Sequence, residues 1–256
     1  MFSNTCQQFN VLGEHSLQHL VWKDVVRRNF GIRRNLRQAF TPSVPLGEPS
    51  RFAEGQWVQV LDAPGVRATL DGRSRTRGLL FLDYQWVYCS GVFRVQSVMR
   101  RMIDDDGFFR PISRTVLLEG VDCGGAHGTT GCGRHCPLMF RDEWLQPATA
   151  PAHAAASDTV IYKRVRPASE IRATLDWQGK RHGLMFMPEM ERWAGQRFRL
   201  ARTVQRVFEL GRHTATPRTF YILDGLHCSG DVLGGRGPCH RACSVLWHDD
   251  WLVDDA

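Results

Sequence analysis

The chain has 256 residues, of which 43% are hydrophobic and 23% are charged, and its formal net charge is +7 at pH 7. This composition is ordinary for a globular protein and argues against wholesale disorder. The modest positive charge permits an anionic partner without requiring one. No apolar run approaches the length that crosses a bilayer, so we expect no membrane span.

The first residues and the cysteine content together predict a cytoplasmic protein. Residues 1–8 have neither the basic segment nor the apolar segment that a secretion signal combines. The chain contains eight cysteines, and cysteines in a non-secreted protein are more often metal ligands than disulfides. Disulfides and free thiols are the alternatives to metal binding.

Residues 1–50 are expected to form a basic N-terminal helix and a linker. Apolar residues recur at helical spacing from Leu17 to Val26, and several arginines lie between and after them. Residues 41–49 are rich in proline and read as an extended connection. The helix either packs on the rest of the protein or docks a partner, which would be a protein, an acidic surface or nucleic acid.

An internal repeat is the most informative feature of the chain. A constant offset of 105 residues relates Phe93 to Phe198 and Cys123 to Cys228. Two more residues enter the second copy after this point, so the later cysteines and tryptophans match at an offset of 107. A repeat this regular predicts two domains of the same architecture.

The repeat divides the chain into a first unit, residues 51–146, and a second unit, residues 158–256, with a linker at 147–157. Each unit carries about five short apolar or alternating runs between turn signals, which is typical of a small barrel. In the first unit we expect strands at 57–60, 67–70, 78–82, 93–98 and 115–118. The predicted fold is therefore mainly β, with two small SH3-like β-barrels in tandem after a short α-helical segment.

Each unit ends in a cysteine loop: one cysteine after a strand, a glycine-rich segment, and two cysteines separated by three residues. These cysteines are Cys123, Cys132 and Cys136 in the first unit and Cys228, Cys239 and Cys243 in the second. Thiolates bind zinc strongly, and structural zinc takes four protein ligands. We therefore predict one or two zinc ions, each needing one further ligand.

The fourth ligand differs between the units. In the first unit Cys89 is the best candidate, with His135 and His127 as rivals. Because Cys89 stands in a loop in the middle of the unit, it would join that loop to the C-terminal one. The repeat aligns Cys89 with Ala194, so the second unit lacks this cysteine.

The second unit therefore needs a different ligand. His240 lies between two of its cysteines and is the first choice, while His227 or a water molecule is the alternative. Three protein ligands with one open position are typical of catalytic zinc, so any chemistry would belong to this unit.

Two other properties bear on the cofactor. Arg134 and Arg241 lie inside the two Cys-x3-Cys segments, where a cation would offset the negative charge of the thiolates. An iron–sulfur cluster is the alternative to zinc, although the cysteine spacing matches neither common ferredoxin pattern. The sequence contains no Walker A motif, nucleophile elbow, His-Glu-x-x-His or dinucleotide motif, which favours a non-catalytic protein.

The combined pattern resembles a set of uncharacterised bacterial proteins with tandem SH3-like barrels and a Cys…Cys-x3-Cys metal loop. The residues that carry the resemblance span both repeats, roughly 51–253, and include Tyr88-Cys89, Gly120-Val121-Asp122-Cys123, Cys132, Cys136 and Trp144-Leu145. The resemblance implies no particular activity. It supports Cys89 as a ligand, and Ala194 departs from the pattern.

These observations predict a non-catalytic, metal-stapled adaptor or accessory protein that binds through its barrels. A protein is the expected partner. Two alternatives stay open: a redox or metal-dependent enzyme component that uses an iron–sulfur cluster or the second metal site, and a nucleic-acid-binding protein. The sequence does not indicate the oligomeric state.

Overall fold

The structure, a computed structural model, describes residues 44–103, 109–125, 131–151, 160–209, 212–231 and 238–255. The predicted N-terminal helix, Cys6 and His127 lie outside these residues. In the described part of the chain, no helix is long and apolar enough to span a membrane.

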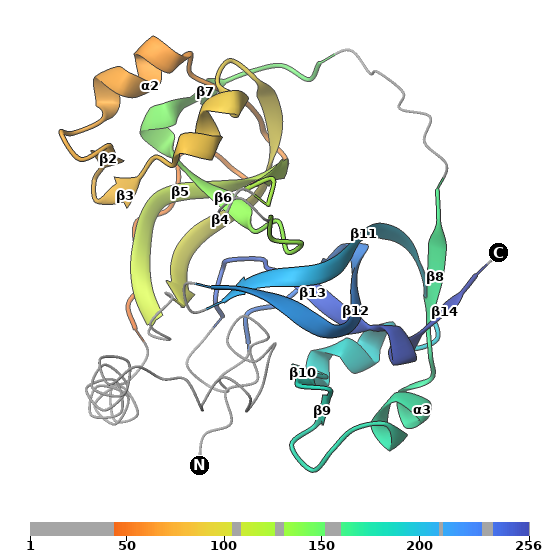
Figure 1. Ribbon diagram of the computed structural model, residues 1–256. Coiled ribbons are helices and arrows are strands. Elements are labelled where there is room, and N and C mark those ends of the chain that lie inside the picture. The colour runs from red at the N-terminus through yellow and green to blue at the C-terminus, as the bar shows by residue number, and fades with distance from the viewer. Residues whose placement is uncertain are drawn as a thin grey trace.

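The described residues are mainly β and form two similar halves, each built on a five-stranded antiparallel sheet (Figure 1). In the first unit the strand order is β6-β5-β4-β1-β7, made of β1 (Trp57–Val60), β4 (Val92–Ile103), β5 (Phe109–Asp122), β6 (Pro137–Arg141) and β7 (Leu145–Pro147). The second unit has the order β13-β12-β11-β8-β14, made of β8 (Tyr162–Val165), β11 (Arg197–Glu209), β12 (Arg212–His227), β13 (Ser244–His248) and β14 (Leu252–Asp254). The outer strands of each sheet are not paired with one another, so the described residues do not close a barrel.

The repeat extends to irregularities of strand pairing. The β4–β5 ladder shifts register between Val95 and Ser97 and again between Met99 and Arg101. The β11–β12 ladder shifts at the equivalent positions, between Leu200 and Arg202 and between Val204 and Arg206. Bulges bend a strand and increase its twist. Both long hairpins therefore bend at matching points.

One expected strand in each unit is a helix instead. Residues 67–70 were expected to be extended, but they fall at the end of α2 (Ala63–Thr69), and α3 (Ala168–Ala173) repeats it. The Asp62 side chain caps α2 by accepting a hydrogen bond from the Gly65 N–H at 2.8 Å. This cap and a proline in the first turn favour a helix start, and they outweigh the short alternating pattern that follows.

The other expected strands are confirmed in part. β1 has the expected bounds, and the expected strands at 93–98 and 115–118 lie inside the longer β4 and β5. The apolar run at 78–82 contributes only β3 (Leu79–Leu80), which pairs with β2 (Arg75–Thr76), and β9 (Lys180–Arg181) pairs likewise with β10 (Leu184–Met185). Short 3-10 helices complete each unit: η2 (Asp83–Tyr88), η3 (Asp142–Trp144), η4 (Pro188–Trp193) and η5 (Asp249–Trp251).

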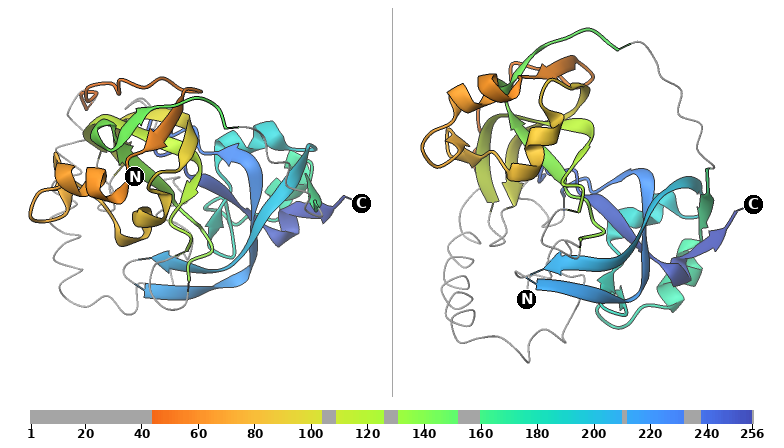
Figure 2. Two further views of the ribbon diagram at one scale, coloured as in Figure 1. Left: turned by 90° about the horizontal axis from the view of Figure 1, so that it is seen from above. Right: turned by 45° about the horizontal axis from the view of Figure 1, so that its top comes forward.

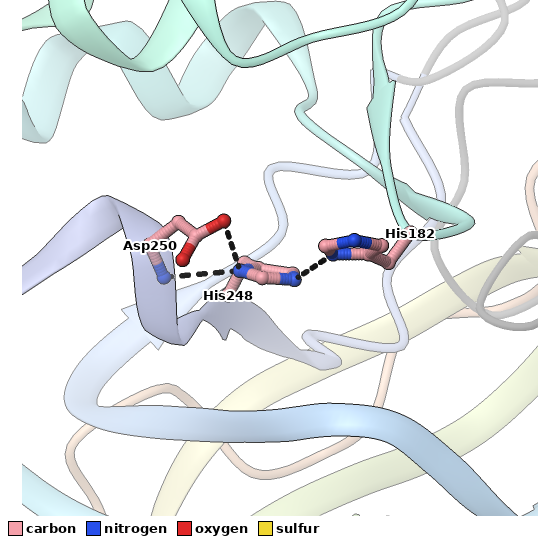
Figure 3. A group of neighbouring side chains, drawn as sticks. All are labelled: His182, His248 and Asp250. Carbon is pink, nitrogen blue, oxygen red and sulfur yellow. Dashed lines mark hydrogen bonds and ion pairs between the residues drawn. The ribbon is translucent and has the colours of Figure 1, made fainter.

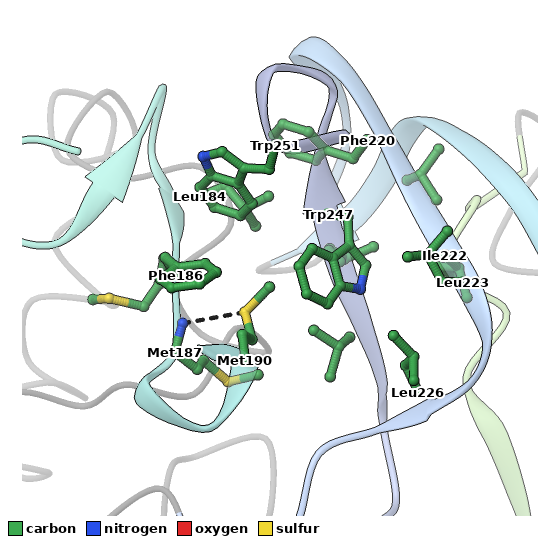
Figure 4. Packing of buried hydrophobic residues seen from close by; sticks show 14 of the residues in the cluster. Leu184, Phe186, Met187, Met190, Phe220, Ile222, Leu223, Leu226, Trp247 and Trp251 are labelled. Atoms are coloured by element: carbon green, nitrogen blue, oxygen red, sulfur yellow. Dashed lines mark hydrogen bonds between the residues drawn. The ribbon is translucent and has the colours of Figure 1, made fainter. Parts of the chain in front are cut away.

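Each unit has its own hydrophobic core around a tryptophan that follows the cysteine loop. Trp144 and Trp251, the repeated tryptophans, are both completely buried. In the second unit, the rings of Phe186 and Trp251 meet edge to face with centroids 5.3 Å apart (Figure 4). Trp247 lies in the same cluster and is also fully buried. Aromatic residues that bury this much surface dominate core energetics.

The two units pack against each other through their long hairpins, β4–β5 and β11–β12 (Figures 1 and 2). Ile103 and Phe109, at the end of the first unit's hairpin, belong to the hydrophobic core of the second unit. Met99, Met102, Ile112 and Leu117 form a further cluster that contacts Cys239. The α2 and α3 regions lie at opposite ends of the molecule (Figure 1).

Candidate metal centres

Backbone hydrogen bonds connect the segments that carry the three predicted cysteine ligands of the first unit. Cys123 directly follows β5, and its N–H donates to the carbonyl of Cys136 at 3.0 Å. The Cys132 N–H donates to the carbonyl of Gly125 at 2.9 Å. The side chains of Cys123 and Cys136 also share a hydrogen bond. The ends and the middle of this loop are therefore drawn together.

The second cysteine loop is built in the same way. The Cys228 N–H donates to the Cys243 carbonyl at 2.8 Å, and the Cys239 N–H donates to the Gly230 carbonyl at 2.9 Å. The Gly230 N–H lies 3.3 Å from the Cys228 sulfur and donates to it. Gly230 has a φ of 82°, and a Cβ at this position would lie 1.9 Å from the Cys239 carbonyl oxygen. Only glycine allows the loop to close so tightly.

Each cysteine loop lies against the long hairpin of the other unit. The Phe208 N–H in the second unit donates to Cys132 Sγ in the first at 3.3 Å. The Ile103 N–H in the first unit donates to Cys239 Sγ in the second, also at 3.3 Å. These two contacts are the same contact related by the repeat, since both partners occupy equivalent positions.

The neighbouring residues repeat this exchange. The Gly133 N–H donates to the Arg206 carbonyl at 2.9 Å, and the His240 N–H donates to the Arg101 carbonyl at 2.9 Å. The two loops therefore contact the two hairpins with approximate twofold symmetry. Backbone groups supply these bonds, so the contact depends on the fold of each loop more than on individual side chains.

Two thiols of the cysteine loops, those of Cys136 and Cys243, have raised pKa values. The hydrogen bond with Cys123 and burial raise the pKa of Cys136 well above its usual value. Burial also raises the pKa of Cys243, while Arg241 opposes this effect. The positive charge of Arg134 opposes the rise in the pKa of both thiols. Arg134 and Arg241 thus have the charge-offsetting position that the sequence predicts, and metal binding would release protons here.

The structure places Cys89 at the C-terminal end of η2, where it packs against the core of the first unit. Burial raises the pKa of its thiol, Asp62 adds to that rise, and Arg67 opposes it. The charged groups that act on Cys89 thus belong to α2 and its cap. Its role as fourth ligand stays a prediction.

Two histidines of the second cysteine loop contact the opposite hairpin. His240 Nδ1 accepts a hydrogen bond from the Arg100 N–H at 3.0 Å, and burial, together with Arg101 and Arg100, lowers the His240 pKa. His227 Nε2 lies 3.2 Å from Gln96 Nε2. A metal would have to use the remaining nitrogen of either ring, and that role stays a prediction for His240.

Asp122 is a residue at the first cysteine loop that the sequence did not single out as part of the site. Its carboxylate lies 3.1 Å from His135 Nδ1 and accepts the Gly124 N–H at 2.7 Å. Its other oxygen lies 3.2 Å from Arg202 of the second unit. The Tyr88 hydroxyl donates to the Asp122 carbonyl at 2.7 Å. Asp122 thus ties its loop to η2 and to the second unit.

A separate group of ligand-type side chains lies in the second unit, formed by His182, His248 and Asp250 (Figure 3). Each offers one donor atom, and the three donor atoms lie within 4.8 Å of one another. Among the described residues, these are the only side chains that meet this criterion, so the three sulfurs of neither cysteine loop lie that close together. The nitrogens His182 Nδ1 and His248 Nε2 are 2.9 Å apart, and the two rings stack.

The elements around η5 position this group. His248 ends β13 and is completely buried, and burial lowers its pKa. Its Nδ1 lies 2.6 Å from Asp249 Oδ1. Burial opposes the ionisation of Asp250, but the hydrogen bond from Arg181 at 2.7 Å and the charges of Arg181 and the two histidines together outweigh burial, so the Asp250 pKa is lowered.

No protein family, curated protein or solved structure matches this chain. The two units are therefore each other's reference. The positions of His182, His248 and Asp250 are occupied in the first unit by arginine, arginine and glutamate, namely Arg77, Arg141 and Glu143. The repeat conserves the location of this cluster and changes its chemistry.

The sequence patterns do not indicate the group of His182, His248 and Asp250. His182 and His248 are 66 residues apart, and nothing in their local sequence resembles a ligand motif. The detectable signal was the repeat itself, because two arginines in one copy become two histidines in the other.

Proposed function

We propose that the chain is a non-catalytic, metal-stapled protein that binds a protein partner as an adaptor or accessory subunit. The observation that carries this proposal is the reciprocal pair of hydrogen bonds from Phe208 to Cys132 and from Ile103 to Cys239, each 3.3 Å long. A metal in either loop would stabilise its own unit and the contact between the units.

The hydrogen bonds favour metal thiolates because a neutral thiol is a weak acceptor, whereas a charged acceptor strengthens the bond. Hydrogen bonds to metal-bound sulfur are also a recurrent way of tuning such centres. Cys123 and Cys132 are at most 3% exposed. A metal held there would be closed to substrates, which favours a structural ion, with zinc as the proposed metal.

The architecture of each unit supports a binding role. We propose that the two units, each with a five-stranded antiparallel sheet, are SH3-like modules. The cysteine loop of each unit faces the other unit of the same chain. Two apolar side chains are strongly exposed: Val87 in η2 is 79% exposed, and Trp177, after α3, is 89% exposed. Tryptophan is enriched in the interfaces between proteins. The surfaces around these two side chains are therefore the proposed partner surfaces.

Metal analysis and a visible spectrum of the whole protein, purified without air, test this proposal. We expect one or two zinc ions per chain and no colour. A brown, reducible chromophore would replace zinc with an iron–sulfur cluster and favour the redox alternative. Binding to random oligonucleotides that weakens steeply with salt would instead favour the nucleic-acid alternative.

A further inference from the structure

We propose that His182, His248 and Asp250 form a second kind of metal site, which takes a divalent ion of the zinc class without any cysteine. The proposal goes beyond the cysteine loops and does not depend on them. Imidazole and carboxylate ligands suit zinc, cobalt, nickel and copper ions.

The His248 ring is oriented through one of its two nitrogens, as a metal-bound histidine usually is. Histidines that bind metal donate their other ring N–H to a carboxylate or carbonyl, which fixes the ring and the tautomer. His248 Nδ1 lies 2.6 Å from Asp249 Oδ1 and accepts a hydrogen bond from the Asp250 N–H at 3.0 Å, so neighbouring groups fix the ring through Nδ1. The Asp250 N–H is 3.0 Å from Asp249 Oδ1 and satisfies that carboxylate further. His248 Nε2 is the ring nitrogen that faces His182.

The two histidine rings bring one nitrogen each close together. His248 Nε2 and His182 Nδ1 are 2.9 Å apart and share a hydrogen bond, so an ion that bonded to both nitrogens would replace the proton between them. His248 is completely buried, whereas His182 is exposed at the surface. A small outward movement of His182 would admit an ion that bonds to both nitrogens and to water.

The second unit lacks a positive charge that the first unit has at the equivalent position. In the first unit, Arg141 is buried, and its guanidinium donates to the carbonyl of Arg77 at 2.9 Å and to the hydroxyl of Thr115 at 3.2 Å. The fixed positive charge of Arg141 is absent from the second unit, because its position there holds His248. The position of Thr115 holds Phe220, which cannot accept a hydrogen bond.

The acidic partners are kept while this positive charge is lost. Asp142 and Glu143 of the first unit become Asp249 and Asp250, so both carboxylates persist in the second unit. Arg181, which stands where the first unit has Thr76, is the arginine that pairs with Asp250. One arginine then faces two carboxylates, and a bound cation would restore the balance found in the first unit.

To join an ion at the Nε2 edge of His248, the Asp250 carboxylate must turn around that ring. It lies at the Nδ1 edge of His248, whereas His182 lies at the Nε2 edge (Figure 3). Ligand atoms bond zinc at roughly 2.0–2.2 Å, so the group must contract slightly from its present separation. Arg181 occupies Asp250 Oδ2 at 2.7 Å, which leaves Oδ1 to turn toward the ion.

Cobalt(II) titration of the full chain tests the proposal, with ions per chain counted after removal of excess metal. His182→Asn removes the imidazole and suits the backbone, since His182 has a φ of 47° and asparagine tolerates this conformation. Arg77→Asn is the matched control, because Arg77 has the same φ of 47° in the first unit. We expect His182→Asn to bind one ion fewer than the parent protein and Arg77→Asn to bind the same number.

Asp250→Asn provides a second variant that keeps the side chain's size. We expect it to weaken binding of this one ion by about tenfold or more. Sulfur-to-cobalt charge-transfer absorption reports the cysteine loops separately and should be unchanged in both variants. Equal stoichiometry and affinity in the parent, His182→Asn and Asp250→Asn proteins would overturn the proposal and leave a hydrogen-bonded chain only.

Discussion

The backbone N–H of Phe208 donates to the sulfur of Cys132 across the boundary between the two units, at 3.3 Å. The repeat produces the same bond between Ile103 and Cys239. Each cysteine loop therefore completes its hydrogen bonding with the hairpin of its neighbour. A change in either loop should be felt by both units.

Replacing Cys132 or Cys239 with alanine should remove metal and destabilise the whole chain. The expected loss is about 3 kcal/mol or more, because a structural metal contributes its binding free energy to folding. Metal content and urea unfolding measure the two effects. Cys6→Ser is the control, because Cys6 lies outside the repeat. Full metal content in both alanine variants would contradict the ligand assignment.

Arg101 should matter more to stability than its repeat equivalent, Arg206. Arg101 is only 5% exposed, and it donates to the carbonyls of Val44 at 2.9 Å and Pro238 at 3.3 Å. Arg101→Met leaves these buried carbonyls without their donors and should cost about 1–3 kcal/mol. Arg206 is exposed, so Arg206→Met should cost less than about 0.5 kcal/mol. Equal losses in urea unfolding would show that Arg101 does not hold the units together.

The tight closure of the second cysteine loop predicts a difference between two glycines. Gly225 and Gly230 have φ values of 74° and 82°, so alanine is strained at both. Nothing lies within 4 Å of a Cβ at Gly225, whereas at Gly230 it would overlap the Cys239 carbonyl. Gly225→Ala should cost about 1–2 kcal/mol and keep its metal. Gly230→Ala should lower metal content as well, and identical metal content in the two variants would count against the loop geometry.

The sequence predicted the repeat, the β class and the three cysteines of each loop, since these are local patterns with a fixed offset. It missed α2 and α3, because Arg67-Ala68-Thr69-Leu70 alternates like a strand while the helix is set by the cap at Asp62. A short alternating run carries less information than a capping residue followed by proline.

The sequence could not show which hairpin each cysteine loop contacts. A repeat gives the same local pattern whether a loop packs on its own unit or on its neighbour. It also could not bring His182 to His248, because β13 and the turn after β9 meet only in the folded second unit. The predicted ligands Cys89 and His240 depend on such distant contacts, and their roles stay predictions.

Thr76 should stabilise the first unit through the buried indole of Trp144. The Trp144 Nε1–H donates to Thr76 Oγ1 at 2.9 Å. Thr76→Val keeps the shape and removes the acceptor, so it should cost about 1–3 kcal/mol. Thr76→Ser keeps the hydroxyl and should cost clearly less. In the second unit Trp251 uses Thr174 at 3.2 Å, so its core should be unaffected. Equal destabilisation by valine and serine would argue against the hydrogen bond.

X-ray absorption spectroscopy at the edge of the bound metal tests most directly whether the cysteine loops hold it. If the cysteine loops bind zinc, we expect zinc with sulfur neighbours at about 2.3 Å, the distance of a zinc–thiolate bond. This sulfur signal should disappear in the Cys132→Ala, Cys239→Ala double variant. A metal surrounded only by nitrogen and oxygen at about 2.0–2.2 Å, with no sulfur in the parent protein, would contradict the account.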